Sequence, residues 1–101
     1  MRREVIQKLE NIHDGVLKAN GGNVQLLTFI MVGGNFINYF VQKGVIYENE
    51  RDECFRYFSD KIFFKYDCPF PGAREGWVYF MEDLNNSYNE EYMSKYRPYI
   101  F

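Results

Sequence analysis

The side chains that could do chemistry in this sequence are few and scattered. The single imidazole is His13, next to Asp14, and the two thiols are Cys54 and Cys68. A nucleophilic site needs a nucleophile, a base and a group that orients the base. Neither cysteine lies in a motif typical of a reactive thiol, and no CxxC or HxxxH spacing indicates a zinc site. We therefore expect no catalytic residue, no metal and no cofactor, and we do not expect an enzyme.

Acidic pairs and glycine pairs are equally poor candidates for a catalytic or nucleotide site. Neighbouring acids such as Glu90 and Glu91 point apart on a helix and do not converge on one ligand. The glycine pairs at 21–22 and 33–34 lack the lysine and the spacing of a phosphate-binding loop. A small hydrolase or metal protein built on His13 and carboxylates is the least favoured alternative.

The cysteines and the apolar runs indicate a reducing, aqueous environment. Two cysteines make no disulfide framework, and the first residues carry charge without a following apolar segment, so we expect no signal peptide. No apolar run reaches the length that spans a membrane. We expect a soluble, cytoplasmic protein in which Cys54 packs as a small hydrophobic residue and Cys68 precedes Pro69 in a turn.

Aromatic content is the unusual quantity in this chain. Ten Phe, nine Tyr and one Trp make up 20% of its 101 residues, and each ring can bury about 150–250 Å². A domain of 12.2 kDa cannot enclose all of them, so we expect some tyrosines at the surface, where they anchor protein interfaces. The net charge of −2 argues against direct contact with nucleic acid.

Acids and tyrosines gather near the end of the chain without a basic residue between the acids. We expect a protein-binding surface here, made of Glu82, Asp83, Tyr88, Glu90, Glu91, Tyr92 and Tyr96. Opposing potentials raise association rates and set register, so this surface suits a partner protein with a basic face. A solvated helix face with acids near its N-terminus is the plainer interpretation of the same residues.

The preferred hypothesis is a small acidic inhibitor or neutraliser that occludes a basic site on a partner in a one-to-one complex. In type it resembles toxin-immunity or phage anti-defence proteins, through its size, acidity, surplus of rings and lack of catalytic groups. The alternative is a homo-oligomeric structural or regulatory protein, in its simplest form a homodimer, whose tyrosines and C-terminal residues pack against a second copy.

Hydrophobic periodicity predicts one all-α domain over residues 1–101, a compact bundle of four to five helices. Apolar residues recur at steps of three and four over residues 2–20, 49–66, 75–84 and 87–95. Asn20 with the two glycines after it should stop the first helix, and residues 67–72 should form a loop.

The segment from Val24 to Val41 is ambiguous, because it is apolar nearly all round. Its length favours helical segments on both sides of Gly33 and Gly34, whose cost of roughly 1.6–2 kcal/mol is tolerable if another helix crosses closely there. A buried strand over residues 24–32 would instead give an α+β fold. A short extended piece is expected at residues 45–47, and Pro98 should end the last helix. The following tail, residues 99–101, is too apolar to be free and should dock on the body or on a partner.

Overall fold

The computed structural model describes residues 1–24, 26–65 and 88–101, and within them the chain is helical without strands. Its elements are α1 (Arg3–Ala19), α2 (Leu26–Gln42), the 3-10 turn η1 (Glu48–Glu50), α3 (Arg51–Lys65), α5 (Glu90–Ser94) and α6 (Arg97–Ile100). The predicted all-α fold is thereby confirmed. Residues 26–32 belong to α2, so the strand alternative for that stretch is wrong.

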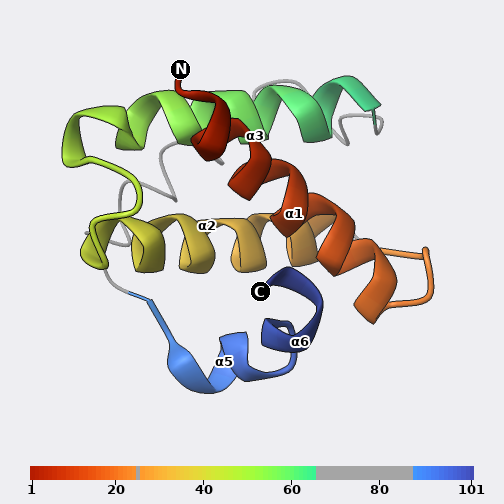
Figure 1. Ribbon diagram of the computed structural model, residues 1–101. Coiled ribbons are helices and arrows are strands. Elements are labelled where there is room, and N and C mark those ends of the chain that lie inside the picture. The colour runs from red at the N-terminus through yellow and green to blue at the C-terminus, as the bar shows by residue number, and fades with distance from the viewer. Residues whose placement is uncertain (25, 66–87) are drawn as a thin grey trace.

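The helices pack around one hydrophobic core. In Figure 1, α2 and α3 run one above the other, α1 crosses in front of them, and α5 and α6 close the bundle below. The buried apolar residues come from every helix and are Val5, Leu9, Ile12, Val16, Phe29, Val32, Phe36, Ile37, Phe40, Ile46, Cys54, Phe55, Phe58, Met93, Tyr96 and Ile100. Among the described residues, no helix has the length and hydropathy needed to cross a lipid bilayer.

Helix α1 has nearly the predicted bounds, and its end follows the expected chemistry. Gly21 and Gly22 adopt φ angles of 66° and 84°, which side chains rarely tolerate. The amide of Gly22 donates to the carbonyl of Leu17 at 2.7 Å, and the side chain of Asn20 donates to the carbonyl of Val16 at 2.9 Å. The chain therefore leaves α1 in a defined direction toward α2.

Helix α2 continues through Gly33 and Gly34, where the sequence indicated a break between two helical segments. The physical reason is a close crossing with α3. A Cβ on Gly33 would overlap the ring of Phe58, which is fully buried. The glycine thus serves the packing of two helices and does not end one.

The segments that follow α2 agree only in part with the sequence predictions. Residues 45–47 form no strand, although Tyr47 has extended backbone angles just before η1. The predicted helix over 49–66 corresponds to η1 and α3.

The helix expected over 87–95 is shorter, because Asn89 caps it by accepting a hydrogen bond from the amide of Tyr92 at 3.0 Å. Pro98 begins a helix instead of ending one, since it lies in the first turn of α6, where a missing N–H costs nothing. The predicted loop at 67–72, the predicted helix at 75–84 and Cys68 lie outside the described residues.

Candidate protein-binding surface

The start of α5 is fixed to α2 by a buried side-chain amide. Asn35 is only 5% exposed. Its Nδ2 donates to the carbonyl of Met31 at 2.7 Å, and its Oδ1 accepts the backbone N–H of Asn89 at 2.7 Å. A buried amide must find such partners, so this contact sets where the C-terminal segment begins to run over the body of the protein.

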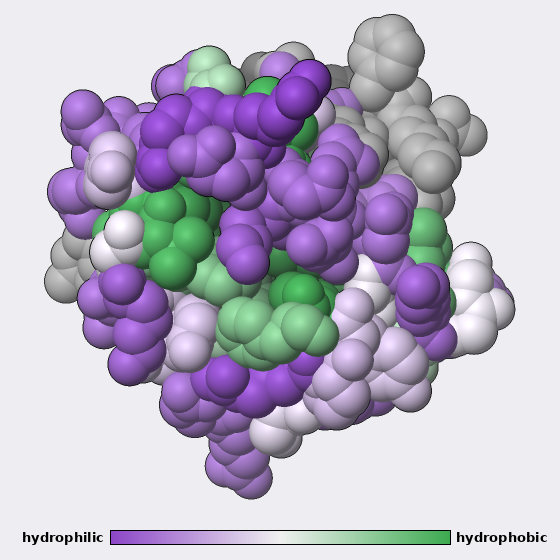
Figure 2. All heavy atoms as spheres, viewed as in Figure 1, coloured by the Kyte–Doolittle hydropathy of each residue, from purple (hydrophilic) through white to green (hydrophobic). Residues whose placement is uncertain are grey.

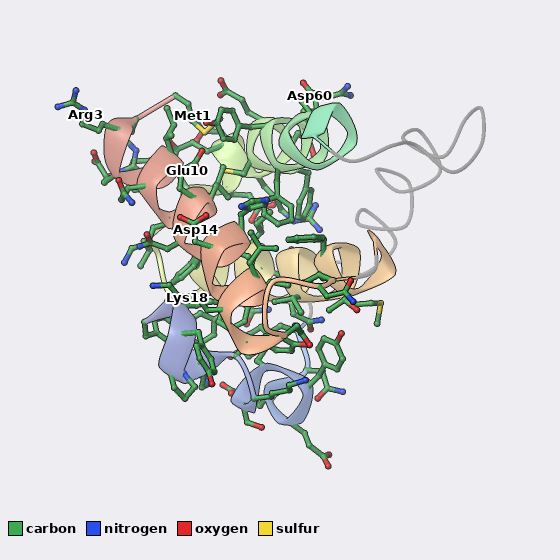
Figure 3. All side chains as sticks on the ribbon, turned by 90° about the vertical axis from the view of Figure 1, so that its right-hand side faces the viewer. Met1, Arg3, Glu10, Asp14, Lys18 and Asp60 are labelled. Atoms are coloured by element: carbon green, nitrogen blue, oxygen red, sulfur yellow. The ribbon has the colours of Figure 1, made fainter. Side chains whose placement is uncertain are left out.

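Helix α6 is fixed to α1 at a glycine. A Cβ on Gly15 would lie 2.5 Å from Cγ1 of Ile100 and 2.9 Å from the carbonyl oxygen of Tyr99. Only glycine therefore lets the backbone of α6 approach α1 this closely. Ile100 is 6% exposed, which confirms that the tail docks on the body, and Figure 3 shows α6 next to the part of α1 that carries Asp14 and Lys18.

The residues on either side of Ile100 point outward. Tyr99 is 49% exposed and Phe101 is 56% exposed. The ring of Phe101 nevertheless packs on α2, with its centroid 5.8 Å from that of Phe36, 5.6 Å from that of Tyr39 and 5.7 Å from that of Phe40. Such tilted ring pairs are favourable, so Phe101 is held in place while half of it faces solvent.

We call Tyr88, Tyr92, Tyr99 and Phe101 the C-terminal aromatic surface. Tyr88 and Tyr92 are half-buried, and Tyr88 packs edge-on against Tyr39 with a centroid distance of 5.3 Å. Figure 2 shows hydrophobic residues at the surface in the middle of the face where the chain ends, bordered by hydrophilic residues; the tyrosines are not hydrophobic on its scale and do not belong to the green patch. Apolar surface with a polar border is the usual anatomy of a protein interface.

The charges beside this surface have both signs. Nη2 of Arg97 donates to Oε2 of Glu90, and its guanidinium carbon lies 4.9 Å from the ring centroid of Tyr39 and 5.2 Å from that of Phe101. Hydrogen bonds to Glu90 and then to Tyr39 raise the pKa of Arg97. Glu91 and Lys95 are exposed nearby. The described part of this face therefore carries bases beside the acids on which the sequence prediction depended.

The structure brings part of the predicted contact set together. Glu90 and Glu91 are exposed in the first turn of α5, beside the half-buried Tyr88 and Tyr92. Burial raises the pKa of Tyr92, with further contributions from the charge and hydrogen bond of Tyr96. Glu82 and Asp83 lie outside the described residues.

Tyr96 does not lie on the outer face. It is 4% exposed and belongs to the hydrophobic core, where its ring centroid is 6.0 Å from that of Tyr92. Three residues after the fully buried Met93, it falls on the inward side of the segment. Tyr96 therefore supports the ring of Tyr92 from within and offers no contact area of its own.

Sequence reasoning missed Arg97, Tyr99 and Phe101 as surface residues. The signal was present in the alternation of the tail, in which one aliphatic residue is flanked by two rings. Arg97 and Phe101 are also four positions apart, a spacing that places two side chains on one helix face. The contribution of Tyr39 from α2 carries no such local signal, because it depends on how the tail docks.

Two of the groups considered for chemistry, His13 and Cys54, are buried. His13 is 1% exposed, its ring stacks on Phe29 with centroids 5.1 Å apart, and its Nδ1 lies 3.1 Å from Oδ1 of Asp14. Burial, with a smaller effect from neighbouring acids, raises the pKa of Cys54 to about 12. Its thiol thus stays protonated at neutral pH, as expected of a packing residue. Within residues 1–24, 26–65 and 88–101, no three His, Cys, Asp or Glu side chains are grouped to hold a metal ion.

A further exposed ring, that of Tyr47, follows the C-terminal end of α2 and packs against a cation. Tyr47 is 56% exposed, and the guanidinium carbon of Arg2 lies 4.1 Å from its ring centroid. Arg2 donates to both carboxylate oxygens of Glu50, at 2.9 and 2.6 Å, and to the carbonyl of Val45 at 3.0 Å. The hydrogen bond from Arg2 is the main cause that lowers the pKa of Glu50 to about 2. This ion pair ties the start of α1 to η1.

Comparison with known proteins gives no relative for this chain. No family model matches the sequence, and neither a curated protein nor a solved structure matches it. What the chain does is therefore inferred from its own residues.

Proposed function

We propose that this chain acts by binding another protein and has no catalytic chemistry of its own. In this proposal it is a small acidic inhibitor or neutraliser that occludes a basic site on its partner. The observation that carries the proposal is the outward placement of Tyr99 and Phe101 on a backbone fixed at Gly15. Rings that are already positioned lose little conformational entropy on binding, which makes them effective anchors.

The acids would contribute mainly to the rate of association. Glu91 is exposed, the side chain of Glu90 is 58% exposed, and the chain carries a net charge of −2. Negative potential attracts a basic partner from a distance but adds less to the lifetime of the complex. Since Glu90 already pairs with Arg97, we assign most of the affinity to the rings.

Self-association is the second candidate, and one observation favours it. Two acids, Glu90 and Glu91, and two bases, Lys95 and Arg97, lie within one short segment. In a two-fold interface, residue i of one copy contacts residue j of the other and residue j contacts residue i, so a surface with both signs can pair with itself. This alternative predicts a particle of twice 12.2 kDa.

The two candidates are separated by purifying the tagged chain from its native host with two matched variants. The test variant combines Tyr99→Ser and Phe101→Ser, and the control is Tyr47→Ser, whose ring is 56% exposed elsewhere. We expect the wild type and the control to retain one partner at equal molar amounts. The test variant should release that partner at least about thirtyfold faster, as expected for the loss of interface anchors.

Circular dichroism establishes that the test variant is folded before the result is used. If a folded test variant keeps its partner as tightly as the control does, this surface is not the interface. If only a second copy co-purifies, the protein is a homo-oligomer. In an isolated complex, Glu91→Lys should slow association, and the size of this effect should fall as salt is added.

A further inference from the structure

We infer that Tyr39, Phe101 and Glu90 form a binding site for a guanidinium group, which Arg97 of the same chain fills in the free protein. We further infer that an arginine of a partner protein takes this position in a complex. The first statement concerns the isolated chain, and the second rests on the proposed function.

The geometry of the site matches the chemistry of a guanidinium. A cation is attracted to a ring when it lies within about 6 Å of the centroid, and the guanidinium carbon of Arg97 lies 4.9 and 5.2 Å from the two rings. The carboxylate of Glu90 accepts one of its N–H groups. A carboxylate beside aromatic faces is an environment that favours arginine over lysine.

The two aromatic walls of the site are held in place by contacts other than those with Arg97. The rings of Tyr39 and Phe101 contact one another, with centroids 5.6 Å apart at an angle of 65°. Phe40 supports both of them from α2, at 5.6 and 5.7 Å. A second cation, the Nζ of Lys43, lies 5.6 Å from the ring centroid of Tyr39, so this ring is already a point of attraction for positive charge.

The occupant can be exchanged because the site opens to solvent. The side chain of Arg97 is 30% exposed and that of Glu90 is 58% exposed. Ion pairs at such positions contribute little to stability. A partner arginine delivered next to Tyr99 and Phe101 would compete at a high effective concentration. Arg97 then acts as an internal competitor, and emptying the site should strengthen binding of an external guanidinium.

The test uses a small probe and needs no partner. The site is emptied in Arg97→Gln, with Arg97→Ala as a second emptied variant, and Lys95→Gln is the control that removes the same charge two residues away. N-acetylarginine amide is titrated while the ring protons of Tyr39 and Phe101 are followed by NMR. We expect both emptied variants to bind the probe at least about tenfold more tightly than the wild type and the control do. N-acetyllysine amide should bind more weakly.

Two further results decide the inference. Adding Phe101→Leu to Arg97→Gln should abolish the gain, whereas a gain that survives this change would place the probe elsewhere and overturn the site. Equal probe affinity in Arg97→Gln and Lys95→Gln also overturns it. When a partner is in hand, Arg97→Gln should bind it at least as tightly as the wild type does. A weaker complex would show that Arg97 itself contacts the partner and would overturn the exchange, while the probe result still stands by itself.

Discussion

Replacing Gly33 by alanine should destabilise this protein, although the same change stabilises most helices. Alanine is favoured over glycine in a helix interior by about 0.8–1.0 kcal/mol. Here the new Cβ would overlap three ring carbons of Phe58, of which Cζ, the farthest, is 2.9 Å away, whereas carbon atoms pack best at about 3.5–4.0 Å. Overfilling a packed core costs about 1–3 kcal/mol.

The overlap should outweigh the gain in helix propensity, because Phe58 is 0% exposed and its ring has no solvent to move into. We expect Gly33→Ala to lower the free energy of unfolding by up to about 2 kcal/mol. For a domain of this size, the midpoint of thermal unfolding should fall by about 4–8 °C for each kcal/mol.

Urea denaturation followed by far-UV circular dichroism measures this loss, and a double-mutant cycle with Phe58→Leu assigns it to the ring. In the Phe58→Leu background, where the crossing is less crowded, Gly33→Ala should become neutral or stabilising. The coupling energy should then be about 1–3 kcal/mol. If Gly33→Ala stabilises the wild type, or if the coupling is absent, α3 does not cross α2 at this glycine.

Three further predictions concern the contacts that position the two ends of the chain. Gly15→Ala should loosen α6, because the new Cβ would lie 2.5 Å from Cγ1 of Ile100. Relative to the wild type, the rate of hydrogen exchange should rise more in α6 than in α1. Asn35→Ala should cost about 0.5–1.5 kcal/mol, because the part-buried backbone N–H at the start of α5 loses its acceptor, and urea denaturation measures this cost. Glu50 has its pKa lowered from 4.5 to about 2, so its pairing with Arg2 stabilises the fold above pH 4.5 and is lost as the pH falls toward 2. The difference in urea midpoint between wild type and Glu50→Gln should therefore shrink over that interval, and a constant difference would contradict the pairing.

Local patterns predicted the helices of this protein better than their junctions. The periodicity of α1 and the glycines after Asn20 depend on backbone and side-chain preferences within a few residues, so they could be recognised directly. The continuity of α2 through Gly33 could not, because it depends on the ring of Phe58 from a helix that is 25 positions away in the sequence. Glycine is a breaker or a close-packing residue according to what crosses it.

The candidate surface shows the same limit. Composition indicated that some tyrosines would be exposed but not which ones, and the exposed Tyr99 was not in the predicted contact set. Which ring turns inward depends on the close approach of α6 to Gly15 of α1 and on the buried Met93. The inward placement of Tyr96 could therefore be recognised only from the tertiary structure. The pairing of Glu90 with Arg97 was likewise hidden, because seven residues and a change of helix separate them.

Site-specific photo-crosslinking in the native host shows whether the face that carries Tyr99 meets a partner protein. A benzophenone amino acid replaces Tyr99 in one variant and Tyr47 in another, two rings that are 49% and 56% exposed at different places on the surface. We expect position 99 to crosslink to one dominant protein other than this chain, and position 47 not to do so. Equal crosslinking from both positions, none from position 99, or an adduct of only twice 12.2 kDa would contradict this expectation.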